Sequence, residues 1–157
     1  MNNFTGPLDV RYLDDGHHWE VLRGFTYRVG DPNSAMFVHI PKGFVTDFAS
    51  FPLGILLKSP GGKWDKPAVV HDLLYKRGWI ERDKHRVTLE RKDCDDIFKE
   101  AMQVAGVDWF RRQIIYAGVR IGGWKPWAKY RKADHELVEN LAVMAGKAGR
   151  LRRERGD

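Results

Sequence analysis

The stretch Asp65-Lys66-Pro67-Ala68-Val69-Val70-His71-Asp72-Leu73-Leu74-Tyr75-Lys76-Arg77-Gly78 decides the fold of this chain. Asp65 can cap a helix that has Pro67 in its first turn, and Gly78, after two basic residues, can end it. His71 and Asp72 interrupt an otherwise apolar middle. Because an ionisable group is costly to bury without a partner, we expect both side chains to find partners on neighbouring elements.

The residues before this helix favour strands. Trp19–Val29 and Ala35–Ile40 are rich in aromatic and β-branched residues, and the cluster Gly30–Ser34 between them is typical of a turn. This pattern predicts an antiparallel hairpin. A short strand around Val10–Leu13 is expected to turn back into it, and Phe44–Asp47 predicts a short extended piece.

The residues after it favour helices. Thr88 can cap a helix that runs to about Val104, and Asp108 can cap another that runs through Ile121. A fourth helix is predicted from Pro126 to about Ala145, with Trp127, Tyr130, Leu137, Leu141 and Met144 on one apolar stripe.

These elements predict an α+β fold, in which a small antiparallel β layer packs on a C-terminal bundle of about four helices. We expect one domain over residues 1–145, β-rich over 1–58 and helical over 64–145. Residues 146–157 are expected to form a basic, frayed tail.

Composition narrows the class of protein. The chain has 157 residues and a single cysteine, so it can form no internal disulfide framework. It has neither an apolar run long enough for a membrane span nor an N-terminal signal pattern. We therefore expect synthesis in a reducing cytoplasm.

The net charge of +6 is placed unevenly. Residues 1–108 hold 15 Lys/Arg and 16 Asp/Glu, whereas residues 109–157 hold 12 and 5. A basic C-terminal third can simply solvate an outer helix face, but it can also attract an anionic lipid surface or nucleic acid.

One cluster of polar side chains could form a catalytic site. Tyr75 lies one turn after His71, and Asp95 falls at the edge of the apolar stripe on the next helix. If the two helices pack antiparallel, Asp95 reaches both side chains and fixes the tautomer of the imidazole. Asp72 points about 100° away round the helix, where it could ligate calcium with the carbonyls of Gly61 and Gly62. The same residues would also serve as a hydrogen-bond network that holds two helices together.

This arrangement resembles the active-site helices of phospholipase A2: a Gly-Gly loop, Asp-x-Pro, then His71-Asp72-x-x-Tyr75, and an aspartate on the next helix. The resemblance covers about residues 61–98. It implies that His71 is the general base for water, that Asp72 binds calcium with loop carbonyls, and that Asp95, held by Tyr75, orients the imidazole. The viral versions of the motif, which lack disulfides, are the nearer comparison.

A second resemblance is broader. The signature joins Phe44-Val45-Thr46-Asp47-Phe48-Ala49-Ser50-Phe51-Pro52, the His71-Asp72 helix, and Asp95-Asp96-Ile97-Phe98-Lys99-Glu100-Ala101-Met102 with the Arg/Tyr/Gly helix that follows. It resembles an uncharacterised family encoded by tailed phages and prophages, domain of unknown function 1353. The likeness adds Thr46, Asp47 and Ser50 as residues that line the same site.

Two hypotheses follow. In the first, the chain is a phage or prophage protein that hydrolyses a phospholipid or related ester with the help of calcium, and an anionic lipid surface is its docking site. In the second, it is a non-catalytic virion component of the tail or tail tip that binds other phage proteins, and the His-Asp-Tyr cluster only braces the fold. Nucleic-acid binding through the basic third is a further alternative.

Overall fold

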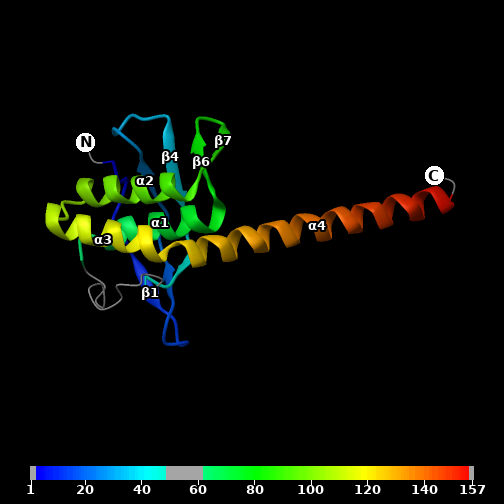
Figure 1. The fold of residues 1–157 in the computed structure, drawn as a ribbon, viewed down its shortest axis with the longest axis horizontal. Coiled ribbons are helices and arrows are strands. Elements are labelled where there is room, and N and C mark those ends of the chain that lie inside the picture. The colour runs from blue at the N-terminus through cyan, green and yellow to red at the C-terminus, as the bar shows by residue number, and fades with distance from the viewer. Residues whose placement is uncertain (1–2, 49–61, 156–157) are drawn as a thin grey trace.

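The computed structural model describes residues 3–48 and 62–155 (Figure 1). It confirms the α+β class, with two small antiparallel sheets and four helices. The first sheet has the order β1-β2-β5, made of Val10–Tyr12, Trp19–Val21 and Val45–Thr46. The second has the order β3-β4-β6-β7, made of Phe25–Arg28, Met36–Ile40, Trp79–Arg82 and His85–Thr88.

The single strand expected over Trp19–Val29 is divided between the two sheets. β2 pairs with β1 and β5, whereas β3 pairs with β4. The chain bends at Leu22 and Arg23. At the next residue, Gly24, a Cβ atom would lie 3.0 Å from the carbonyl oxygen of Ile40, so glycine permits this close approach of two backbones. The hairpin around Gly30–Ser34 forms as expected, between β3 and β4.

The β6–β7 hairpin was not predicted, because residues 79–88 are mostly charged or polar and show no pattern typical of strands. A tight turn at Asp83, whose φ is 53°, joins the two strands. β6 also pairs with β4, and Ile80 is fully buried. Val87 of β7 also packs against the core, so two apolar side chains anchor this mostly polar hairpin.

The helices are α1 (Asp65–Arg77), α2 (Arg91–Val104), α3 (Trp109–Gly122) and α4 (Trp124–Arg155).

Two of the expected helix caps were wrong. Trp64 occupies the N-cap of α1, and Asp65 instead accepts the N–H of Gly62 at 3.0 Å. Thr88 ends β7, and α2 begins with a capping box between Glu90 and Asp93. The cap of α3 by Asp108 and the end of α1 at Gly78 are as expected.

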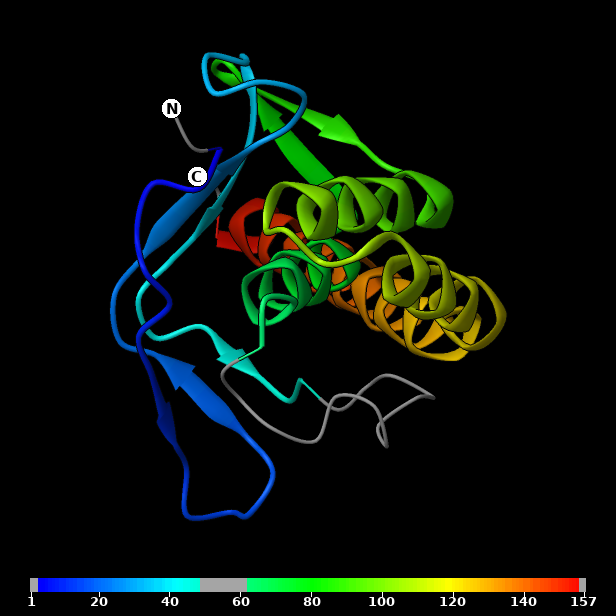
Figure 2. The same cartoon turned by 90° about the vertical axis from the view of Figure 1, so that its left-hand side faces the viewer.

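Helix α1 lies at the centre of the molecule, and Pro67 to Tyr75 are all buried (Figure 2). The strands lie along one side of the helices, with α2 and α3 packed beyond α1. The amide of Leu89, just before α2, donates to the carbonyl of Gly78 at the end of α1, while Ala68 packs with Met102 at the far ends. The two helices are therefore antiparallel, as the predicted site requires.

Helix α4 differs most from the expectation. Trp127 and Tyr130 pack against the core, but Leu137, Leu141 and Met144 are exposed. The helix continues through residues expected to fray and projects far from the body (Figure 1). The bundle thus consists of three helices and the first turns of α4.

Candidate active site

The buried carboxylate of Asp95 is the centre of the site. Its Oδ1 atom lies 2.8 Å from Nε2 of His71 and accepts the hydroxyl of Tyr75 at 2.6 Å. Its Oδ2 atom accepts Nη1 of Arg120 at 2.7 Å, and Nη1 of Arg91 lies 3.5 Å away. We call these five residues the Asp95 cluster. Donors from α1, α2 and α3 thus meet on one side chain with no exposed surface.

Burial and these hydrogen bonds determine the ionisation states of Asp95 and His71. Burial raises the pKa of Asp95, but the hydrogen bonds from His71, Tyr75 and Arg120 together outweigh it and hold that pKa below its ordinary value. Burial lowers the pKa of His71 more strongly than Asp95 raises it. Asp95 is therefore an anion and His71 a neutral imidazole at neutral pH.

The hydrogen bond between Asp95 and the neutral ring of His71 fixes the tautomer of that ring. Because Asp95 can only accept, Nε2 of the neutral ring carries the hydrogen and Nδ1 carries the lone pair. The ring contacts Tyr75 at a centroid distance of 4.1 Å and Phe98 at 4.7 Å, which hold its plane. A neutral, oriented imidazole of this kind can accept a proton and be stabilised as imidazolium by the carboxylate.

Asp72 faces a different set of partners. The hydroxyl of Thr46 on β5 donates to its Oδ2 atom, and both side chains are buried. The pKa of Asp72 is raised to about 7, chiefly by burial and also by the nearby charge of Asp47, although Thr46 and Lys76 act in the opposite direction. Burial is the main cause of the raised pKa of Tyr130 on α4, and the charges of Asp72 and Asp47 raise it further. We call Thr46, Asp47 and Asp72 the β5–α1 acidic site.

The structure brings some predicted site residues together and separates others. His71, Tyr75 and Asp95 meet as predicted, and Thr46 and Asp47 join Asp72.

Gly62 lies apart from Asp72. Its carbonyl accepts the N–H of Asp65 at 3.1 Å, and Asp72 lies seven positions, about 10 Å, further along the helix. Gly61 and Ser50 lie outside the described residues. Within residues 3–48 and 62–155, no group of three His, Cys, Asp or Glu side chains is arranged to hold a metal.

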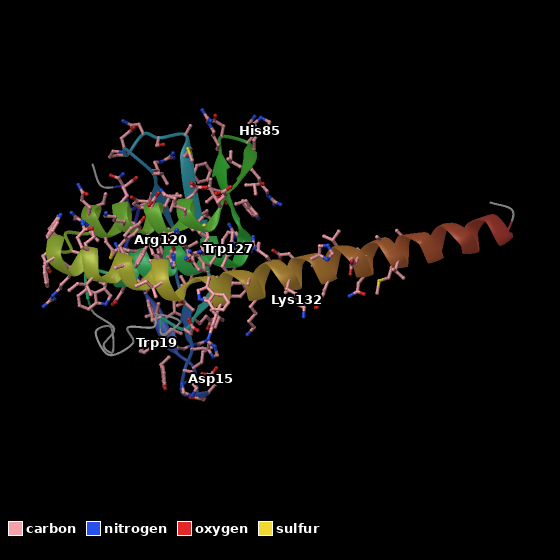
Figure 3. The ribbon with its side chains drawn as sticks, in the orientation of Figure 1. Asp15, Trp19, His85, Arg120, Trp127 and Lys132 are labelled. Carbon is pink, nitrogen blue, oxygen red and sulfur yellow. The ribbon has the colours of Figure 1, made fainter. Side chains whose placement is uncertain are left out.

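Two members of the Asp95 cluster were missed in the sequence. Arg91 precedes Asp95 by four residues, a spacing that predicts an ion pair on one helix. Arg120 comes from α3 and reaches Asp95 across a helix interface. Figure 3 labels Arg120 among the packed helices. No local spacing connects Arg120 to Asp95, which is why this contact could not be found from the sequence.

A family model described as "Protein of unknown function (DUF1353)" matches residues 19–119. The chain belongs to this family. The match runs from β2 through most of α3, so it includes the β5–α1 acidic site and four members of the Asp95 cluster, with Arg120 one residue beyond it. No curated protein and no solved structure matches the chain.

None of the described helices has the length and apolar character that crossing a bilayer requires.

Proposed function

We propose that this member of the DUF1353 family is a hydrolase that cleaves a phospholipid or a related ester with His71 as general base. The observation that carries the proposal is the 2.8 Å contact between His71 Nε2 and Asp95 Oδ1, with the Tyr75 hydroxyl on the same oxygen. This geometry supports a neutral imidazole whose Nδ1 lone pair can take a proton.

The proposed reaction uses one water molecule. Nδ1 of His71 removes a proton from water as its oxygen attacks the ester carbonyl carbon. Asp95 stabilises the imidazolium that forms. The acyl C–O bond then breaks, and the imidazolium returns the proton to the leaving alcohol oxygen. Arg120 and Arg91 keep Asp95 ionised throughout, because their positive charges favour the carboxylate.

Calcium is the second part of the proposal. Asp72 and Asp47 are two oxygen ligands of the kind that calcium prefers. Burial and the charge of Asp47 raise the pKa of Asp72, so a further positive charge beside it would favour its ionised form. A bound calcium ion would supply that charge and stabilise the developing oxyanion. Gly62 has no part in this proposal, because its carbonyl belongs to the start of α1.

The test is fatty-acid release from phosphatidylglycerol vesicles, with calcium and with a chelator. The parent chain is expected to require calcium, and His71→Gln to lower the rate by about 100-fold or more. His85→Ala is the matched control, because His85 is exposed at the tip of the β6–β7 hairpin (Figure 3). Equal rates for the parent and His71→Gln would contradict the assignment of the base.

A second candidate is a non-catalytic virion component of a phage tail or tail tip, made in the host cytoplasm and built into the particle. The observation in its favour is the burial of the Asp95 cluster: His71 is 4% exposed, and one carboxylate holds three helices together. Under this candidate the parent releases no fatty acid at any calcium concentration, and His71→Gln lowers only the melting temperature. Mass spectrometry of purified particles would then detect the chain.

A further inference from the structure

The outer part of α4 presents an apolar surface that nothing in the described part of the chain covers. In Figure 3 the label of Lys132 marks the region where α4 leaves the body. Every side chain from Lys132 to Ala145 is exposed. Five of them are large and apolar, each 55 to 65% exposed: Leu137, Val138, Leu141, Val143 and Met144. A single helix that projects into water gains nothing from this surface unless a partner covers it.

The spacing of the apolar residues indicates what kind of partner fits. Trp127, Tyr130, Leu137, Leu141 and Met144 fall on one series with alternating steps of three and four, which continues to positions 148 and 151. Such a repeat of 3.5 residues is the seam of a coiled coil. One position of the series, 134, is polar, and a single polar position of this kind can fix the register of a coiled coil.

The charges along α4 indicate the orientation of the partner. Residues 133–139 contain three acidic residues and no Lys or Arg, whereas residues 146–152 contain three Lys or Arg and no acidic residue. If two copies of α4 run antiparallel with Leu141 of one opposite Met144 of the other, the acidic segment of each copy lies opposite the basic segment of its partner. A parallel, in-register pair would place like charges together at both segments.

The acidic residues already have ion pairs within α4, but these pairs are too weak to compete strongly with ion pairs to a partner helix. Asp134 lies 3.1 Å from Arg131, and Glu136 lies 3.8 Å from Lys132. All four side chains have at least 30% of their surface exposed, and exposed pairs of this kind contribute little.

We propose that the outer part of α4 binds a second copy of this chain in an antiparallel coiled coil centred between Leu141 and Met144. The inference is independent of the hydrolase proposal, since it uses no residue of the Asp95 cluster or the β5–α1 acidic site. The apolar seam provides the affinity and the opposed charges select the orientation.

The first experiment measures the mass of the full chain in solution by light scattering over a dilution series. The parent is expected at twice its chain mass of 18.2 kDa, and Leu137→Gln/Leu141→Gln at the chain mass. Phe110→Gln, which removes an apolar side chain of similar exposure from α3, is the matched control and stays dimeric. A monomeric parent, including one that binds only lipid vesicles or another protein, overturns the proposal, as does a dimer that survives the double substitution.

The second experiment tests the orientation by reversing charges. Asp134→Lys/Glu136→Lys/Glu139→Lys and Lys147→Glu/Arg150→Glu/Arg152→Glu are each expected to lose the homodimer. All six substitutions in one chain restore it in an antiparallel pair, because the opposed segments are again complementary. A parallel pair would leave like charges together in the sixfold variant, so failure of the restoration overturns the antiparallel arrangement.

Discussion

At the scale of the residue, Asp72 and Asp95 show how surroundings give one side-chain type two electrostatic states. Both carboxylates are buried. Asp95 accepts from three donors that include a guanidinium, so it remains charged, whereas Asp72 accepts from the neutral Thr46 hydroxyl and faces the charge of Asp47. An anion with cationic partners therefore lies against one face of α1, and a carboxyl group with a raised pKa lies on a face about 100° away.

The raised pKa of Asp72 predicts a pH dependence of stability. The unfolded carboxyl ionises near 3.8 and the folded one at about 7. Between these values the folded state binds more protons, so the contribution of Asp72 to stability falls as the pH rises from about 4 to 7. We expect Asp72→Asn to gain stability over the parent across this window, by up to about 4 kcal/mol above pH 7. Urea denaturation at a series of pH values measures the difference, and a constant difference would contradict the assigned pKa.

The Arg120–Asp95 contact predicts a destabilised variant. Arg120→Ala leaves Asp95 buried with a weaker set of partners, and we expect a loss of about 2 kcal/mol in the free energy of unfolding. Arg111→Ala on the same helix removes an exposed pair with Asp108 and should change stability by less than about 0.5 kcal/mol. Because the pKa of Asp95 is lowered in the folded state, the loss should shrink as acid protonates the carboxylate. Equal losses for the two variants would show that the contact does not stabilise the fold.

Three residues of the Asp95 cluster could be predicted from the sequence, because helical spacing alone places them. His71 and Tyr75 share a helix face, and Asp95 lies on the apolar side of the next helix, so antiparallel packing was sufficient to predict their meeting. Helical spacing says nothing about residues from other elements. The Thr46–Asp72 bond depends on where β5 crosses α1, so Thr46 was suggested only by a family resemblance and its partner was not predicted.

At the scale of the element, the end of α1 is fixed by two features that depend on each other. Gly78 adopts a left-handed conformation with φ of 68° and closes the helix. Nη2 of Arg131 on α4 donates to the carbonyls of Tyr75 and Lys76 at 3.0 and 2.8 Å. A guanidinium at a helix C-terminus satisfies these carbonyls and favours the helix dipole. This contact attaches the first turns of α4 to α1.

The close approach of Gly78 to Arg131 predicts a difference between two glycine substitutions. Gly78→Ala places a Cβ atom against the Arg131 guanidinium, whereas Gly30→Ala, also at positive φ, meets no atom within 4 Å. Both substitutions strain the backbone by about 1 kcal/mol. Only Gly78→Ala should also weaken the contact with α4, and we expect its loss of stability to exceed that of Gly30→Ala by at least about 1 kcal/mol. Thermal unfolding of both variants measures this, and equal melting temperatures would contradict the role of Arg131.

The elements that were hard to predict are those whose pairing is not local. The β3–β4 hairpin was visible because its turn residues lie between two β-rich segments. The division of β2 from β3 depends on pairing with different strands, and Gly24 between them approaches a residue sixteen positions later, which no local window contains. The β6–β7 hairpin is short and mostly polar, and its place in the sheet comes from pairing with β4.

At the scale of the whole molecule, burial is concentrated around α1 and declines along α4. Side chains of α1 pack with both sheets and with α2, whereas α4 contributes Trp127 and Tyr130 and then leaves the core. Local stability should follow this gradient, because amides open most readily where few apolar contacts must break.

Hydrogen exchange measured by mass spectrometry tests the gradient. We expect the amides of α1 to exchange slowest in the molecule, since their opening exposes the largest buried surface. In the monomeric Leu137→Gln/Leu141→Gln variant, α4 beyond Arg131 should exchange fastest among the helices, because most of the stability of a helix in a protein comes from tertiary packing, which this segment lacks. In the dimeric parent, the same amides around Leu141 should be protected, while those of α1 remain unchanged. Equal exchange of outer α4 in the two chains would show that dimerisation does not cover this surface. Fast exchange in α1 would contradict its place at the centre of the core.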